Sequence, residues 1–150
     1  MKTILMASCA ALLLTGTAMA QGDIVQTRVA TMKSIGAGLG TLGGMIRGRS
    51  DYDSATAQSA ADAILAAVTS ADAETLFPVD TDEMSVDGTR AKVDIWDNWA
   101  DFAAKYDAMA AAAAPLAATA GDGKAAMTAA FGGFAGTCRA CHETYRGPKL

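Results

Sequence analysis

Alanine is the residue type that most narrows the folds open to this chain, because it accounts for 35 of the 150 residues. Alanine is the best helix former, whereas the residues that favour strands are scarce: Phe, Trp and Tyr together number nine. The length fits one domain, and a hydrophobic fraction of 51% is ample for a packed core. The sequence therefore predicts a single all-α domain.

The first 20 residues have the features of a secretory signal peptide. Lys2 precedes an apolar run over residues 4–14, and residues 18–20 (AMA) supply the small side chains that a signal peptidase recognises. The apolar run is too short to span a membrane. We therefore expect residues 1–20 to be removed, so that a mature domain of residues 21–150 functions in the periplasm. An uncleaved anchor is the alternative.

Apolar residues recur at spacings of three and four in four segments of the mature chain, which predicts four amphipathic helices. The expected helices cover residues 23–47, 53–70, 92–119 and 124–145. Residues 72–90, which contain proline, glycine and several acids, form the one long loop. Short turns and one long loop between four helices predict an antiparallel up-and-down bundle.

Proline and glycine modify two of these helices. Pro115 is expected to kink the third helix or to end it early. Five glycines loosen the first helix, and we interpret them as sites of close helix approach, because no strand precedes them as it would a phosphate-binding loop. These glycines are Gly36, Gly38, Gly40, Gly43 and Gly44.

The chemistry of the chain is concentrated in Cys138-Arg139-Ala140-Cys141-His142. Two cysteines this close would close only a trivial disulfide loop. On a helix, positions i, i+3 and i+4 share a face, so both thiols reach the vinyl groups of one porphyrin while the imidazole points at its iron. This is the attachment sequence of c-type haem. It predicts one covalent haem c, held by Cys138 and Cys141, with His142 as the proximal iron ligand.

Other roles for these residues are weaker. A zinc site would need more ligands than one cysteine pair and one histidine, and a thioredoxin-like motif opens a helix instead of closing one. The chain has a single histidine, which removes most hydrolase chemistry. With that histidine on the iron, no distal imidazole remains for a peroxidase. We therefore expect no enzymatic activity.

Methionine is the best remaining ligand for the second axial position of the iron. In an up-and-down bundle, the end of the fourth helix lies beside the start of the first, and Met32 is about two turns into that first helix. Met84, in the long loop, is the reserve candidate. Alternatively, Met32 is a core residue beside a five-coordinate iron. Three other methionines are expected to fill the core, about 20 Å from the haem end: Met45, Met109 and Met127.

The chain resembles the class II cytochromes c, the family of cytochrome c′ and its low-spin relatives of the c-556 kind. The resemblance covers essentially the whole mature chain and implies a four-helix bundle with haem c near one end. Relatives with one axial histidine usually have a non-ligating residue at the position of Met32, so methionine here is similar to the low-spin branch. Four segments carry the resemblance: residues 28–36 (RVATMKSIG), 76–78 (LFP), 95–96 (IW) and 138–146 (CRACHETYR).

The resemblance also implies roles for two arginines. Arg28, one turn before Met32, is implied to pair with a haem propionate, and an ordinary solvated charge is the alternative. Arg146 matches the Tyr-Arg ending of the family and is implied to lie near His142, although a cation at a helix C-terminus explains it equally well. Four aromatic residues are expected either to wall the haem pocket or to pack in the core: Phe77, Trp96, Trp99 and Phe102.

The predicted ligands indicate an electron carrier. A histidine and a methionine would fill both axial positions, and this pair raises the haem potential relative to stronger donors. The main hypothesis is thus a periplasmic monohaem cytochrome with low-spin iron, which exchanges electrons with other redox proteins. The alternative is a high-spin, five-coordinate cytochrome of the c′ type, which binds NO or CO in gas binding or NO detoxification.

Charge narrows the class of partner. The net charge is −4, and it becomes −5 when Lys2 leaves with the signal peptide. Without a basic run, nucleic-acid binding is not expected. A negative surface predicts redox partners with a basic docking face. No membrane span is expected in the mature protein, and the glycine seam of the first two helices leaves a homodimer open.

Overall fold

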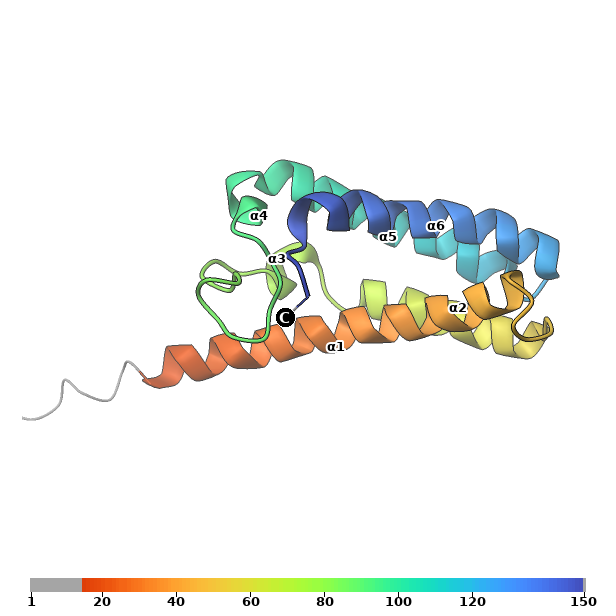
Figure 1. Cartoon of the computed structure of the whole chain (residues 1–150), viewed down its shortest axis with the longest axis horizontal. Coiled ribbons are helices and arrows are strands. Elements are labelled where there is room, and N and C mark those ends of the chain that lie inside the picture. The colour runs from red at the N-terminus through yellow and green to blue at the C-terminus, as the bar shows by residue number, and fades with distance from the viewer. Residues whose placement is uncertain (1–14, 150) are drawn as a thin grey trace, which may run out of the picture.

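The computed structural model describes residues 15–149, with side chains from Gln21 onward, and shows a helical bundle (Figure 1). α1 packs against α2 and α6, and α5 packs against the same two helices. The predicted all-α, antiparallel four-helix bundle is confirmed. The short helices and the loops that join them gather at one end, beside the C-terminus (Figure 1). The elements are α1 (Thr15–Ile46), α2 (Ser54–Thr69), α3 (Ala73–Leu76), α4 (Asp94–Asp97), α5 (Trp99–Thr119) and α6 (Lys124–Tyr145).

The core runs along the middle of the bundle and takes residues from all four long helices. Its fully buried side chains lie at the spacings of three and four that predicted the helices. Burial of such aliphatic and aromatic side chains stabilises the fold by about 1.5–3 kcal/mol each. The largest of them are Leu42, Ile64, Leu116, Met127 and Phe134.

The start of α1 lies earlier than predicted. Helical backbone begins at Thr15, whereas the apolar periodicity places the start at residue 23. Residues 15–22 contain no proline, so nothing in them prevents helical hydrogen bonding. Most of the predicted signal peptide, residues 1–14, lies outside the described residues. Among residues 15–149, no helix is long and apolar enough to cross a membrane.

The predicted third helix is divided in two. α4 ends at Asp97, and Asn98 leaves the helical region with φ −126° and ψ 42° before α5 begins. The backbone N–H and the side-chain amide of Asn98 both donate to the Asp94 carbonyl (3.1 Å each), which closes the single turn of α4 at Asn98. Pro115 does not end α5, which continues to Thr119. Pro115 lies in the last turns of α5 and lacks one backbone N–H donor, so the helix loses a single hydrogen bond there and still continues.

The long loop is more ordered than its composition indicates. It contains α3, whose N-terminus is capped by Asp72 through a 2.7 Å hydrogen bond from the backbone of Thr75. Asp53 caps α2 in the same manner, with Thr56 as the donor (2.7 Å).

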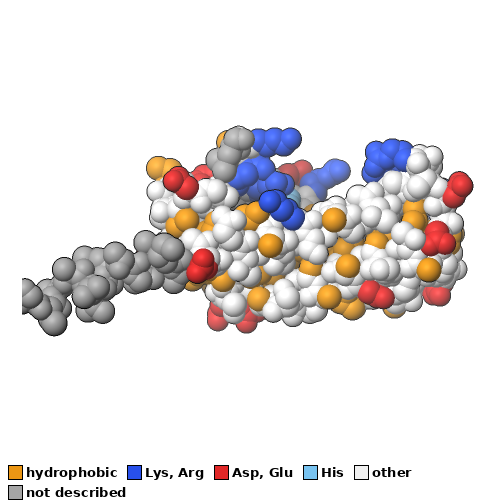
Figure 2. Space-filling view, turned by 90° about the horizontal axis from the view of Figure 1, so that it is seen from below, with side chains coloured by type: hydrophobic (Ala, Val, Ile, Leu, Met, Phe, Trp, Pro, Cys, Tyr) orange, Lys and Arg blue, Asp and Glu red, His pale blue; other side chains and the backbone are white. Residues whose placement is uncertain are grey.

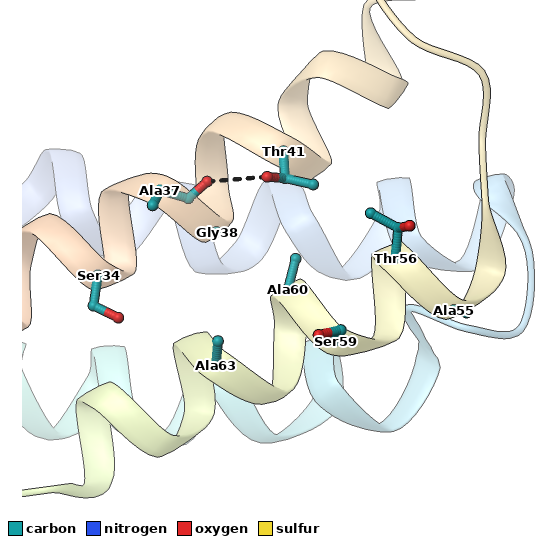
Figure 3. Close-up of a pocket in the computed structure, with 9 residues that line it drawn as sticks. All are labelled: Ser34, Ala37, Gly38, Thr41, Ala55, Thr56, Ser59, Ala60 and Ala63. Atoms are coloured by element: carbon teal, nitrogen blue, oxygen red, sulfur yellow. Dashed lines mark hydrogen bonds between the residues drawn. The ribbon is translucent and has the colours of Figure 1, made fainter.

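Gly38 is the glycine of α1 that close packing requires. A Cβ atom there would lie 2.6 Å from Cγ1 of Ile64 and 2.9 Å from the carbonyl oxygen of Ala60, both on α2. The same atom at Gly40 would meet nothing within 4 Å. Beside this contact, small side chains of α1 and α2 face one another across an open surface groove of about 560 Å³ (Figure 3). The polar side chains that line it are all hydroxyls, such as that of Thr41, which donates to the Ala37 carbonyl (3.3 Å).

Candidate functional site

A cavity of about 490 Å³ lies at the end of the bundle that holds α3 and α4. α1, α5 and α6 form its walls, and the 77–91 segment and the residues after α6 close it. The cavity brings together Met32, Cys138, Cys141 and His142, which lie up to 110 positions apart in the sequence (142 minus 32). The structure thus gathers the predicted haem ligands at one site.

α6 presents the two thiols and the imidazole one turn apart, near its C-terminal end. Both cysteines are free and half-buried. Burial raises the pKa of the Cys141 thiol to about 11 and also raises the pKa of Cys138, so both thiols are neutral. The pKa of His142 is lowered by desolvation and by the positive charges of Arg146 and Arg90. The imidazole is therefore in the neutral form that binds metals.

The donor groups fit a porphyrin and not a lone metal ion. Within residues 15–149, no three His, Cys, Asp or Glu side chains converge so that they could hold one ion. The thiols and the imidazole are instead spread along a cavity whose remaining lining is mostly aliphatic and aromatic. Such a lining suits a flat apolar ring with a few polar anchors. The apolar lining includes Val29, Ile35, Leu39, Ile95 and Met109.

Met32 is the methionine that faces this site from α1. It is half-buried and lines the cavity. Met84, the reserve candidate, is 83% exposed and does not line the cavity, which makes it the weaker ligand. Met45 and Met127 are buried in the core, as predicted. Met109 is also buried in the core, as predicted, and it lines the cavity as well.

Arg28 lines the cavity and at the same time fastens the long loop. It is 4% exposed. Its Nε donates to the carbonyl of Leu76 (2.8 Å), and its terminal nitrogens donate to Thr81 and to the hydroxyl of Thr89 (3.0 Å). The guanidinium also lies over the ring of Phe77, with Cζ 4.3 Å from the centroid. These bonds use four of the five N–H donors of an arginine, so one remains for a propionate.

The aromatic residues divide into two groups. Phe77 and Phe102 line the cavity, in edge-to-face contact at 4.7 Å between ring centroids. Trp96 and Trp99 do not line it and pack beside the core. The Trp96 indole donates to the carbonyl of Phe77 (3.2 Å) and so supports the wall from behind.

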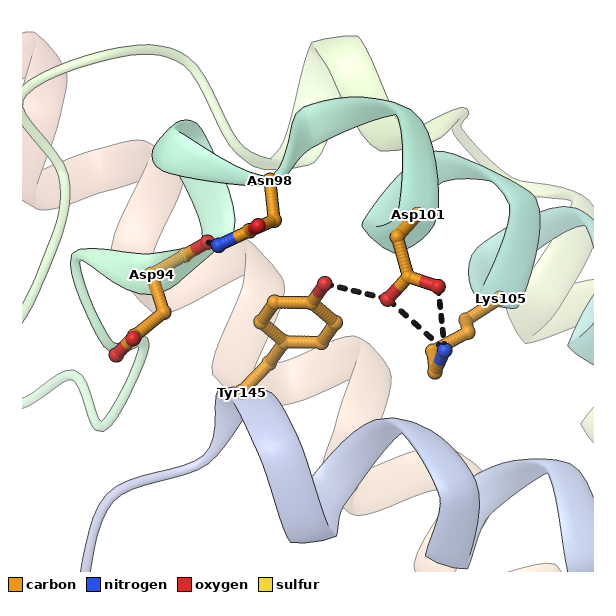
Figure 4. A network of polar contacts seen from close by, with 5 residues as sticks. All are labelled: Asp94, Asn98, Asp101, Lys105 and Tyr145. Carbon is orange, nitrogen blue, oxygen red and sulfur yellow. Dashed lines mark hydrogen bonds and ion pairs between the residues drawn. The ribbon is translucent and has the colours of Figure 1, made fainter.

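Sequence reasoning missed two tyrosines in the wall, Tyr106 and Tyr145. Helical spacing was the available signal, since Tyr106 follows Phe102 by four positions. The Tyr145 hydroxyl donates to the carboxylate of Asp101, which also binds the ammonium of Lys105 (Figure 4). This network connects the end of α6 to the beginning of α5.

The chain after α6 is also fixed. Ala91 and Arg146 form an isolated antiparallel bridge, in which Gly147 donates to the carbonyl of Arg90 (2.8 Å). The side chain of Arg90 in turn donates to the carbonyls of Gly147 (2.9 Å) and Pro148. Arg146 lines the cavity on the same side as His142, near the place that the resemblance implies.

The charges around the cavity have one sign. Five cations line it, whereas none of the 16 Asp and Glu residues does so. On the face shown in Figure 2, Lys and Arg side chains gather over the hollow, and the acidic side chains are scattered from one end to the other. The cations of the lining are Arg28, Lys33, Arg90, Lys105 and Arg146.

Comparisons with known proteins agree with this site. Residues 23–146 match the family described as Cytochrome C′. Cytochrome c′ of Cereibacter sphaeroides is 33% identical over 147 residues, 97% of this chain and 98% of that protein. Cytochrome c-556 of Agrobacterium tumefaciens is 34% identical over 81% of this chain and 95% of that protein. The solved structure titled as cytochrome c′ from Rhodobacter spheriodes gives a TM-score of 0.79 at 31% identity, covering 86% of this chain and 98% of that chain.

Proposed function

The chain belongs to the cytochrome c′ family of class II c-type cytochromes, whose members bind one covalent haem c, and we propose on this premise that it is a low-spin electron carrier. The match covers nearly the whole domain. The family includes proteins named cytochrome c′ and proteins named cytochrome c-556. The choice between a carrier and a gas-binding protein therefore depends on the residues of this chain.

The residues of the cavity would hold the haem in defined roles. Cys138 and Cys141 would form the two thioether bonds, His142 would bind the iron on one side and Met32 on the other. Arg28 would donate its remaining N–H to a propionate. When bound, the haem supplies one-electron redox chemistry at its iron.

The observation that supports the carrier is that Met32 lines the same cavity as His142, from the neighbouring helix α1. A thioether at this position would fill the distal axial site and leave no vacancy for a gas. Phe77 and Phe102 are buried in the wall and exclude water, which limits reorganisation of the site when the charge changes.

Covalent attachment is the first test. Protein from cells that mature c-type cytochromes should have the mass of the 21–150 chain plus one haem, and acid acetone should not extract the porphyrin. A mass without haem, or two free thiols, would contradict the assignment of Cys138 and Cys141.

The spin state is the decisive test. The ferric protein should be low-spin and show the weak near-infrared band of sulfur-to-iron charge transfer. Met32→Ala should abolish this band, and Met109→Leu, at the other methionine in the cavity wall, should keep it. A native high-spin spectrum would support the alternative, a five-coordinate protein that captures NO or CO rapidly. In a carrier, CO should bind the ferrous form slowly, because it must displace Met32.

The remaining parts of the proposal concern location and assembly. We propose that residues 1–20 direct export to the periplasm and are then removed, which N-terminal sequencing of the exported protein tests. The open groove between α1 and α2 is the surface on which a homodimer would form, and the sedimentation of Ala37→Arg protein compared with that of the unaltered protein tests this.

A further inference from the structure

The cations of this chain are distributed unevenly. Residues 21–149 contain 11 Lys and Arg residues, which is the total of 12 less Lys2, and five of them line the cavity. The 16 acids outnumber the cations in the chain, and yet none lines it. The sign of the charge around the cavity is thus opposite to the sign of the net charge.

Three of the five cations are neither deeply buried nor paired with a carboxylate. Arg28 is buried beneath the long loop, and Lys105 is paired with Asp101 at 2.7 Å. Lys33 and Arg146 are exposed, and neither forms an ion pair within residues 15–149. Arg90 is half-buried and donates to uncharged carbonyls. We call Lys33, Arg90 and Arg146 the basic rim.

The basic rim comes from three separate parts of the chain. Lys33 lies on α1, Arg90 precedes α4 and Arg146 follows α6. Glu83 is an acid beside the rim, since its carboxylate would contact a Cβ atom placed at Gly147; it is exposed and forms no ion pair within residues 15–149. Acids at the opposite end of the bundle, such as Asp53 and Asp122, are separated from the rim by the length of α5. That helix has 21 residues, or about 30 Å at 1.5 Å per residue. The Debye length is about 10 Å at 0.1 M salt, so a molecule at the cavity experiences the three cations of the rim and the single nearby carboxylate of Glu83, and not the distant acids.

We propose that the basic rim is the docking surface for an acidic redox protein. This inference rests on the proposed electron carrier and specifies its partner. Because the rim is positive, the partner should carry an acidic patch and not the basic face that the net charge predicts. A globular partner with an acidic patch contacts the rim alone. An extended polyanion, such as a membrane surface, would also meet acids outside the cavity lining, such as Glu83.

Electron exchange with two small reagents of opposite charge tests the local field of the haem-loaded protein. One electron passes from the ferrous protein to hexacyanoferrate(III), or from hexaammineruthenium(II) to the ferric protein. Between about 10 mM and about 200 mM salt, the rate with the anionic reagent should fall, and the rate with the cationic reagent should not. Lys33→Glu should slow the anionic reaction at low salt about threefold or more.

Lys124→Glu is the matched control, because it makes the same charge change on an exposed residue in the first turn of α6, outside the cavity lining. Its rates should equal those of the unaltered protein. The opposite salt dependence for the two reagents would mean that the net charge governs approach, and would overturn the inference while leaving the carrier intact. Slow exchange with both reagents at every salt concentration would instead contradict the carrier.

Direct binding provides a readout that does not depend on electron exchange. Titration calorimetry at low salt should show that an acidic [2Fe–2S] ferredoxin binds, and that Lys33→Glu weakens this binding about tenfold. Lys124→Glu should bind as the unaltered protein does. Binding to anionic phosphatidylserine vesicles without binding to the ferredoxin would overturn the inference in favour of a membrane surface, and no difference between the two variants would overturn the role of the rim.

Discussion

The Tyr145 hydroxyl donates a 2.5 Å hydrogen bond to the Asp101 carboxylate, which joins the last turn of α6 to the first turn of α5 (Figure 4). The tyrosine is 3% exposed and follows His142 by three positions. Burial raises the Tyr145 pKa to about 12, and the bond to Asp101 adds to this shift, so the hydroxyl remains a donor. The bond therefore fixes the haem-binding end of α6 against its neighbour.

Tyr145→Phe should lower the stability of the haem-loaded protein by about 1–2 kcal/mol, because the substitution removes one hydrogen bond to a charged group and keeps the ring. Guanidinium unfolding measures this loss. The reduction potential should also shift, since His142 lies on the same turn. Tyr52→Phe is the control: its hydroxyl donates to the Ala120 carbonyl (2.8 Å) at the far end of the bundle. If both variants shift the potential equally, Tyr145 has no positioning role.

Arg28→Ala should destabilise the protein by about 3 kcal/mol or more, because it leaves buried acceptors of the long loop without their donor. Arg28→Lys should recover little of this stability. An ammonium lacks the planar, forked arrangement of N–H groups with which the guanidinium reaches Leu76, Thr81 and Thr89 together. Hydrogen exchange of residues 77–89 should accelerate in both variants. Arg47→Ala, an exposed arginine just after α1, should leave stability and exchange unchanged. Unaltered exchange in Arg28→Ala would contradict the fastening role.

Gly38→Ala should destabilise the bundle by about 1–3 kcal/mol, because its Cβ would press on the backbone of Ala60 and on Ile64. Gly40→Ala, in the same helix with open space around it, should stabilise by about 0.5–1 kcal/mol. Thermal unfolding of the two variants side by side checks both signs. Equal effects would mean that α1 and α2 do not approach closely at Gly38.

Stability should fall in acid, and helix caps should contribute to the fall. Hydrogen bonds from the side chain and backbone of Thr56 hold the pKa of Asp53 below its usual value of 3.8. As the pH falls, Asp53 is therefore protonated at a higher pH in the unfolded chain than in the folded protein. The stabilisation from the cap is present above about pH 4 and is lost as the pH falls through the lower pKa of the folded state. Asp53→Asn keeps a capping group and should flatten this dependence.

The unfolding midpoint in urea, measured between about pH 6 and pH 2, checks the acid effect. Asp107→Asn is the control, because Asp107 is exposed on α5 and caps no helix. A pH profile of Asp53→Asn identical to that of the unaltered protein would show that the cap does not contribute.

The sequence by itself determined what depends on neighbours along the chain. The periods of three and four predicted the four long helices, and the Cys138 to His142 spacing placed three donors on one face of α6. The loop over residues 72–90 is also a local signal. The break at Asn98 escaped prediction, because it changes the backbone conformation of one residue without altering the apolar pattern.

Only the tertiary structure decided what depends on how the helices meet. The loop partners of Arg28 lie 48 to 61 positions away, so no periodicity could assign them. Met109 and Tyr106 line the cavity because the hollow extends along α5, and its depth is set by packing between helices. The basic rim arises in the same way: net charge averages over all residues, whereas folding brings Lys33, Arg90 and Arg146 to the cavity and keeps the acids out of its lining. Periodicity fixes the faces of each helix, but the rotation and offset of one helix against another depend on side chains far apart in the sequence.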